Sequence, residues 1–318
     1  MSRHGSRSRE AERGTLEEQP RGTAQATYER ETGALTDRLR HAWRRSGVRD
    51  LPIVDRSARA LYSELQRFRY AMQLTSDLRS YRAYRRLDGR GRAVRTATVP
   101  VRVRPLDGLE VALRPRTSDA VMLRETFRDG VHVPPGPIQA RGVRTIVDLG
   151  ANAGITVAAN ALRFPEAVII AVELDPENAE LARRNTARWS DRCTILQGAV
   201  WTEDGEMPYA RRRGNEYGFS VLHGTGTQVT VPAFSMETIL SHVPDQRRVD
   251  FLKMDIEGVE SKILAPERAA WAYRVDAIAL QVHGDYTLED CARDLSALGF
   301  VPRVDRRRID FIGGLRDR

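Results

Sequence analysis

Residues 144–159, RTIVDLGANAGITVAA, constrain the fold of this chain more than any other segment. A short apolar run enters Asp148, a tight turn bounded by Gly150 and Gly154 follows, and an Ala-rich stretch comes next. This order predicts a strand, a glycine loop and a helix, which together open a nucleotide-type binding unit. The two glycines let the backbone turn sharply and approach a ligand closely.

The polar residues of this loop indicate which ligand it suits. Asn152 stands where a dinucleotide-binding G-x-G-x-x-G motif would have its second glycine, and Asp148 lies where such a motif is usually apolar. A carboxylate beside the loop would repel a pyrophosphate and attract a cationic group, such as the α-ammonium of S-adenosylmethionine. The chain also lacks G-x-x-x-x-G-K-[ST], which excludes a P-loop.

An acidic residue at the end of the second strand supports the same ligand. Glu173 follows the predicted strand 167–172, where it could accept hydrogen bonds from both ribose hydroxyls. Gly198 and Ala199 follow the third predicted strand, 193–197, where a loop would line the adenine. The predicted cofactor-binding residues are therefore Asp148, Gly150, Asn152, Gly154, Glu173, Gly198 and Ala199.

From residue 143 onward, predicted strands alternate with predicted helices, which indicates an α/β fold with a mainly parallel sheet and right-handed crossovers. The pattern also predicts an extra strand at 229–234, a short helix at 236–240 and a C-terminal hairpin of 300–304 with 308–312. Ahead of this region, 96–103 and 109–113 read as another hairpin, followed by a helix to about residue 127.

The N-terminal part differs in composition from the rest. Residues 1–27 are rich in Arg, Glu and Gly, which predicts a disordered basic tail. Helical periodicity at 28–43 and 56–78, separated by a break at 51–54, predicts a helical extension spanning 28–92. The catalytic domain is then expected at 93–318, and the extension could support a homodimer.

Acidic residues follow a later predicted strand at the edge where ligands bind in such sheets. The apolar run before Asp255 ends in Asp255 and Glu257, and His283 follows the predicted strand 277–282. Histidine can act as a general base because its usual pKa lies near neutrality. A lone histidine also often serves a structural role, so both roles stay open for His283.

Four segments together resemble the FkbM-type methyltransferases. They are Thr117-Ser118-Asp119 before a helix, VDLGANAG at 147–154, DFLKMDIEGVE at 250–260 and the late Val282-His283. The resemblance covers about residues 101–313, and its most specific part is the string at 255–260.

This resemblance implies a class I (Rossmann-like) methyltransferase fold, with a seven-stranded sheet whose last strand is antiparallel. It also implies S-adenosylmethionine-dependent O-methylation of hydroxyls on sugars or secondary metabolites, with Asp255 and His283 facing the reaction centre. Our first choice for the general base is His283, with Asp255 orienting the acceptor or serving as base instead. This chain departs from the family pattern at Gln281. Many relatives have an acidic residue at this position, in a Glu-x-His motif.

Composition limits the other functions. The net charge is +8, but Lys253 and Lys262 are the only lysines, which favours a compositional bias toward arginine over selection for phosphate contacts. We therefore expect a small-molecule acceptor and no nucleic-acid partner. An RNA or DNA methyltransferase and a non-catalytic binding protein on the same fold remain alternatives.

Further expectations concern compartment and metals. No secretory signal and no bilayer-spanning apolar run is visible, so we expect a cytoplasmic protein with no membrane partner. Cys193 and Cys291 lack ligand spacing and are expected to be buried thiols. Asp175, Asp255 and Glu257 could gather at the sheet edge, but no spacing demands a divalent metal, and none is expected.

Overall fold

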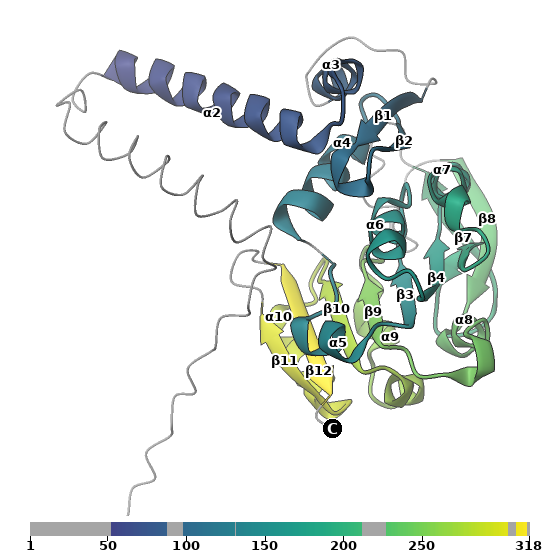
Figure 1. Ribbon diagram of the computed structural model, residues 1–318. Coiled ribbons are helices and arrows are strands. Elements are labelled where there is room, and N and C mark those ends of the chain that lie inside the picture. The colour runs from purple at the N-terminus through teal and green to yellow at the C-terminus, as the bar shows by residue number, and fades with distance from the viewer. Residues whose placement is uncertain (1–51, 88–97, 131, 212–226, 305–309, 317–318) are drawn as a thin grey trace, which may run out of the picture. The chain divides into compact units, whose positions relative to one another are not determined.

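The computed structural model describes residues 52–87, 98–130, 132–211, 227–304 and 310–316 (Figure 1). The chain divides into two compact units, Met1–Leu61 and Tyr62–Arg318. Only the first turns of helix α2 (Pro52–Leu74) represent the first unit among the described residues. The predicted tail at 1–27 and helix at 28–43 lie outside the described residues, and the predicted three-part domain division stays a prediction.

The second unit is built around a seven-stranded sheet in the order β11-β12-β10-β9-β3-β4-β5. Its strands are β3 (Thr145–Leu149), β4 (Val168–Glu173), β5 (Cys193–Gln197), β9 (Phe251–Met254), β10 (Ala277–Gln281), β11 (Phe300–Val304) and β12 (Phe311–Arg316). All neighbours from β10 to β5 are parallel, whereas β12 is antiparallel to both β10 and β11. The predicted mainly parallel, Rossmann-like class I sheet with an antiparallel last strand is confirmed.

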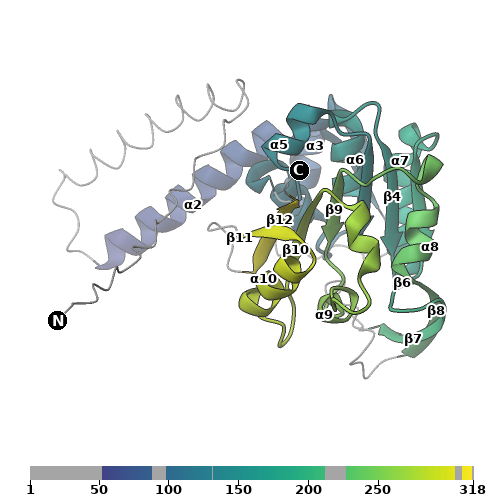
Figure 2. The same cartoon turned by 90° about the horizontal axis from the view of Figure 1, so that it is seen from below.

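Helices cover both faces of this sheet (Figures 1 and 2). Successive strand residues point to opposite faces, so the side chains of β3 divide between two cores. Ile146 packs in the core with α6 (Ile155–Arg163) and α7 (Pro176–Thr186). Val147 packs in the other core, with α8 (Met236–Ser241), α9 (Glu260–Ile263) and α10 (Leu288–Ala297). Burial on both faces explains why the central strands are almost continuously apolar.

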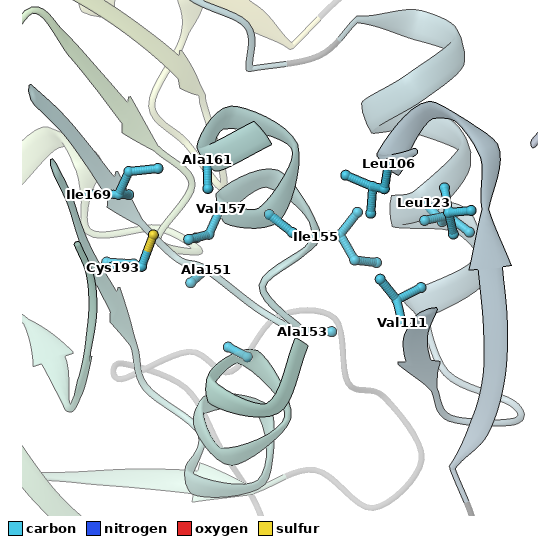
Figure 3. Close-up of a cluster of buried hydrophobic side chains, with 14 of the residues drawn as sticks. Leu106, Val111, Leu123, Ala151, Ala153, Ile155, Val157, Ala161, Ile169 and Cys193 are labelled. Atoms are coloured by element: carbon cyan, nitrogen blue, oxygen red, sulfur yellow. The ribbon is translucent and has the colours of Figure 1, made fainter. Parts of the chain in front are cut away.

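The first predicted hairpin is confirmed and closes over helix α6. Strands β1 (Val99–Val103) and β2 (Leu109–Leu113) pair antiparallel, and α4 (Asp119–Arg124) follows them. Leu106, Val111 and Leu123 face Ile155 at the start of α6 (Figure 3). This layer therefore packs beside the glycine loop that opens α6. A π-helical turn, Glu125–Asp129, continues α4.

The predicted helix at 56–78 is wrong in its bounds, because two helices occupy this region. Helix α2 starts at Pro52, where the missing proline N–H costs nothing, so residues 52–54 of the predicted break belong to the helix. It ends at Leu74, and α3 (Leu78–Leu87) begins after Asp77, whose Oδ1 accepts a hydrogen bond from the Ser80 amide at 2.8 Å. The cap at Asp77 starts the second helix.

The remaining elements follow the sequence pattern with shifted ends. The predicted extra strand is β8 (Thr227–Phe234), in a small sheet with β6 (Ala199–Val200) and β7 (Gly205–Arg211). The C-terminal hairpin is confirmed, although β12 starts three residues later than predicted. Both cysteines are buried, as expected.

Helix α5 (Gly136–Arg141) precedes β3 and completes the set of described α-helices. Among the described residues, no helix combines the length and apolar character that crossing a bilayer requires.

Candidate active site

The site lies where the order of strands reverses along the sheet. The chain passes from β3 outward through β4 and β5, then returns to β9 on the other side of β3. In open α/β sheets, ligands bind in the crevice beyond the carboxyl ends of the strands at such a reversal. The glycine loop follows β3 and Asp255 follows β9, so the topology brings these two segments together.

A cavity of about 220 Å³ opens at this crevice. Its walls come from the glycine loop, the end of β4, the start of β6, the turn after β9, and α4 with its π-helical turn. The predicted site residues that line it are Gly150, Asn152, Glu173, Gly198, Ala199 and Asp255. Three other predicted residues, Asp148, Gly154 and His283, are not among its lining residues.

Asp148 lies in a buried ion pair with Lys253. The two residues are partners in the β3–β9 register, and Lys253 Nζ lies 2.9 Å from Asp148 Oδ1 with both side chains almost fully buried. The other oxygen, Oδ2, accepts a hydrogen bond from the Thr156 hydroxyl at 2.6 Å. Burial alone would lower the pKa of Lys253, but the neighbouring carboxylates, Asp148 foremost, raise it above its usual value. The charge of Asp148 is therefore compensated inside the protein.

Lys253 is a site residue that sequence reasoning missed. It lines the cavity and also donates a hydrogen bond to the carbonyl oxygen of Gly150, which ties β9 to the glycine loop. A signal was present, because Lys253 is one of only two lysines in the chain and interrupts an apolar strand.

The loop glycines are required by contacts within the protein. Gly150 has φ +85°, and a Cβ atom there would lie 1.9 Å from the carbonyl oxygen of Asp255. Gly154 has φ +76°, and its Cβ would lie 2.8 Å from the Cα of Ala182 on α7. Asn152 has φ +49°, a left-handed conformation that asparagine tolerates better than most residues. The loop can therefore approach Asp255 and α7 as closely as it does.

Glu173 ends β4 with both carboxylate oxygens aimed at backbone amides. Oε2 accepts from the Asn152 amide at 2.7 Å, and Oε1 accepts from the Asp175 amide at 2.9 Å. Burial raises the pKa of Glu173 to about 7, against the opposing effect of these hydrogen bonds. Among the described residues, Oε2 accepts from the Asn152 amide alone, so it retains a lone pair that can accept a hydrogen bond from a ligand diol.

A series of polar side chains connects Glu173 to Arg114 and Asp119. Asn178 Nδ2 donates to Glu173 Oε1 at 3.3 Å, and Arg114 donates to Asn178 Oδ1 at 2.6 Å. Arg114 also pairs with Asp119 at 2.8 Å. Asp119 lies in the first turn of α4, and its carboxylate accepts hydrogen bonds from the backbone amide and guanidinium of Arg114.

Gly198 and Ala199 line the cavity beyond Glu173. The Gly198 amide donates to the Glu173 carbonyl at 2.9 Å, which holds the loop against β4. A Cβ at Gly198 would lie 2.6 Å from the Phe234 ring. Ala199 is buried and opens β6. Small residues at both positions leave this wall of the cavity open.

Asp255 stands at the cavity wall between two imidazoles. Its Oδ1 lies 3.6 Å from His283 Nε2, and its Oδ2 lies 3.7 Å from His132 Nε2. Burial raises the pKa of Asp255 above its usual value, although Lys253 and His283 oppose this shift. His132 is buried, lines the cavity and has φ +63°, yet no motif in the sequence marks it.

His283 is held by a fully buried carboxylate. Its Nδ1 lies 2.7 Å from Glu260 Oε1, which leaves Nε2 facing Asp255 and Glu257. Burial alone would lower the pKa of His283, but Glu260 foremost, with Glu257 and Asp255, raises it to about 9. Gln281, at the position of the missing family acid, donates to Asp310 at 2.7 Å. Glu260 thus supplies the carboxylate beside the imidazole.

Asp255, Glu257 and His283 each offer one ligand atom within 4.8 Å of the others. Such spacing is compatible with a divalent cation. Asp175, considered with them from the sequence, instead caps α7, because its Oδ1 accepts from the Glu177 amide at 2.9 Å. The expectation that no metal is needed stays a prediction.

The cavity fits the cofactor predicted from the sequence. Glu173 presents a carboxylate for a diol, and apolar side chains of Ile155, Val172 and Val200 provide a surface for an aromatic base. The Oδ1 atom of Asn152 is buried and has no hydrogen-bond partner among the described residues, so it can accept from a ligand. These features match the donor and acceptor groups of S-adenosylmethionine.

Comparison with known proteins gives matches to methyltransferases. Residues 148–302 match the model of the methyltransferase FkbM domain. A release factor glutamine methyltransferase of Geobacter sulfurreducens is 27% identical over 97 residues, which make up 30% of this chain and 31% of that protein. The match to this curated relative thus spans about a third of its length.

Two solved structures show weaker likenesses. The precorrin-6y C5,15-methyltransferase of Geobacter metallireducens is 14% identical, with 55% of this chain and 81% of that chain covered and a TM-score of 0.35. The N-terminal domain of human METTL16 in complex with SAH is 13% identical, with 67% and 87% covered and a TM-score of 0.36.

The family match begins at the buried aspartate of β3 and ends within β11, before the antiparallel strand β12. It therefore spans both the glycine loop and the acidic turn of this site. The resemblance to the FkbM-type methyltransferases expected from the sequence is thus confirmed over residues 148–302 of this chain.

Proposed function

We propose that this protein transfers the methyl group of S-adenosylmethionine to a hydroxyl of a small molecule of the sugar or secondary-metabolite type. The observation that supports this most is the presence of two different carboxylates on one cavity. Glu173, held by backbone amides, suits a ribose diol, and Asp255 lies at the wall formed by the turn after β9. A cofactor-binding acid and a proton acceptor thus share one space.

The chemistry asks little of the protein beyond placement. S-adenosylmethionine, when bound, supplies a methyl group already activated by its sulfonium sulfur. The protein has to align the acceptor oxygen in line with that methyl group and exclude water. Asp255 or His283 takes the hydroxyl proton as the O–C bond forms and the C–S bond breaks. The proposal includes no metal ion.

Two further expectations belong to this proposal. The protein is expected to act in the cytoplasm, and its N-terminal helices are expected to support a homodimer. Size-exclusion chromatography of the full chain, compared with a chain lacking residues 1–90, tests the second expectation.

Calorimetry with S-adenosylmethionine and its demethylated product tests cofactor binding. We expect Glu173→Gln to weaken binding at least about tenfold, because the ligand diol loses a charged acceptor. Glu166→Gln is the matched control, since Glu166 is an exposed glutamate just before β4. Absence of binding by the unaltered protein would remove the proposal.

Methyl transfer to a panel of glycosides, polyketides and peptides tests the reaction itself. We expect Asp255→Asn and His283→Ala to lower turnover by about 10²-fold or more while cofactor affinity changes little. Cofactor binding without transfer to any hydroxyl compound would instead favour a non-catalytic binding protein. Transfer confined to peptide amides would place the acceptor in another chemical class.

A further inference from the structure

Of the two candidate bases, only Asp255 reaches the cavity wall. Asp255 is among the lining residues, whereas His283 is not. The Nδ1 atom of His283 is engaged by Glu260 at 2.7 Å, and Nε2 points toward Asp255 at 3.6 Å. The three side chains therefore lie in a row, with the buried carboxylate of Glu260 at one end and the cavity at the other.

Glu260 also shapes the turn that carries Asp255. Its Oε1 accepts from the Ile256 amide at 3.3 Å, and its Oε2 accepts from the Gly258 amide at 3.0 Å. Between these amides, Glu257 has φ +58°, a strained conformation for a residue other than glycine. Glu260 is fully buried, so its hydrogen bonds lie away from competing water. One carboxylate thus holds both the turn and the imidazole.

We propose that Glu260 is a positioning residue that, through His283 and the turn amides, holds Asp255 as the group that takes the acceptor proton. This inference rests on the proposed function and assigns the proton within it. The acceptor O–H bond breaks as the new O–C bond forms. Its proton passes to an Asp255 oxygen, and the electron pair of the broken C–S bond stays on sulfur. His283 keeps its protons throughout and orients Asp255.

The charges around His283 support this assignment. Glu260 faces it from α9, and Asp255 and Glu257 face it from the turn after β9. Lys253 on β9 and His132 before α5 face Asp255 from its other sides. Three carboxylates around one imidazole favour its charged form, and the pKa of about 9 agrees with this. A charged imidazole cannot accept a further proton, which leaves Asp255 for that role.

The pH dependence of turnover distinguishes the two candidate bases. If His283 orients Asp255 in its charged form, kcat falls as pH rises through about 9. If His283 is itself the base, kcat rises through the same range, because only the neutral imidazole accepts a proton. A rise would overturn the proposal.

The decisive variant is Glu260→Gln, with Glu267→Gln as the control, since Glu267 is an exposed glutamate beyond α9. We expect Glu260→Gln to lower kcat by about 10–100-fold, as for other partners that orient an imidazole. We also expect the fall of kcat at alkaline pH to begin at a lower pH in this variant. Its cofactor affinity should change less than about threefold. Glu267→Gln should leave all three quantities unchanged. If kcat of Glu260→Gln fell over the same pH range as kcat of the unaltered protein, the proposal would be overturned.

Nitrogen-15 NMR of the His283 ring provides a readout that needs neither cofactor nor acceptor. In the unaltered protein, Nδ1 should stay protonated toward Glu260 through neutral pH, and Glu260→Gln should lower the pKa of the ring. Should that variant fail to fold, Glu260→Asp retains the charge and should keep the ring pKa raised. An ordinary ring pKa in the unaltered protein would overturn the inference. Lack of cofactor binding would overturn the proposed function, whereas the ring pKa tests the pairing of His283 with Glu260 by itself.

Discussion

At the scale of single residues, the site depends on charges that the protein has buried and then compensated. Asp148 has Lys253, whereas Glu173 has amides and a neutral side-chain partner. An isolated buried charge would be very costly, so each of these groups depends on its partner. The two cases predict different responses to mutation and to pH.

Lys253→Met should destabilise the protein strongly, because it leaves the Asp148 carboxylate buried without a counter-charge. We expect the free energy of unfolding in urea to fall by about 3–5 kcal/mol. Lys262→Met is the matched control, because Lys262 is exposed, with Nζ 5.3 Å from the centre of the Trp201 ring. Its loss should cost about 1 kcal/mol or less. Equal effects of the two substitutions would contradict a special role for the buried pair.

Glu173 should make the stability of the free protein depend on pH. Its pKa is raised in the folded state to about 7 from a usual value of 4.5, so the folded state binds the proton more tightly. The resulting stabilisation is complete below about pH 4.5 and is lost as pH rises through 7. Unfolding between pH 5 and 8 should show a loss of the order of 2–3 kcal/mol, since each pKa unit is worth about 1.4 kcal/mol.

Glu173→Gln isolates this contribution, because glutamine does not titrate. The variant should show a flatter stability profile than the unaltered protein over the same pH range. A profile as steep as that of the unaltered protein would assign the pH dependence to other groups.

At the scale of elements, the close approach of the glycine loop to the turn after β9 defines the site. Lys253 donates to the Gly150 carbonyl, and the Asp255 amide donates to the Leu149 carbonyl at 3.0 Å. The two segments are more than 100 residues apart in the chain, yet they share hydrogen bonds.

Gly150→Ala should disrupt this contact, since the new Cβ would lie 1.9 Å from the Asp255 carbonyl oxygen. Gly130→Ala is a control for backbone strain alone, because Gly130 has φ +63° with open space around its Cβ position. The control should cost about 1–2 kcal/mol. Gly150→Ala should cost about 1–3 kcal/mol more, as overpacking does in other proteins. Melting curves of both variants compare the two costs.

The sequence allowed the elements of the sheet to be predicted far better than the contacts between them. Apolar runs ending in a glycine loop, Glu173 or Asp255 predict strands and their carboxyl ends, because these patterns are local. The pairs Lys253–Asp148 and Glu260–His283 depend on strand register and on a turn, which no local pattern specifies. His132 escaped prediction for the same reason, since only the fold brings it to Asp255.

At the scale of the whole molecule, the net charge and the cavity have opposite character. The chain carries a net charge of +8, whereas the cavity is lined by the carboxylates of Glu125, Glu173, Asp255 and Glu257. Arginine-rich surfaces attract polyanions without sequence preference, but an acidic cavity disfavours a phosphate beside the reacting oxygen.

We therefore expect RNA or DNA to bind only weakly and to lose affinity steeply between 50 and 200 mM salt, by about 10³-fold if several phosphates are contacted. Fluorescence anisotropy with a labelled oligonucleotide measures this binding, and methyl transfer to the same oligonucleotide should be absent. Salt-resistant binding together with transfer would make nucleic acid the acceptor.

The hydrogen bonds between the glycine loop and the turn after β9 also have a consequence for dynamics. The amides of Gly150 and Asp255 are both hydrogen-bonded, to Val172 and Leu149 respectively. Because Lys253 joins the two segments, they should open to solvent as one cooperative unit, with similar protection against hydrogen exchange. Both walls of the cavity would then be ordered or disordered together, so that a half-formed site is never a populated state of the protein.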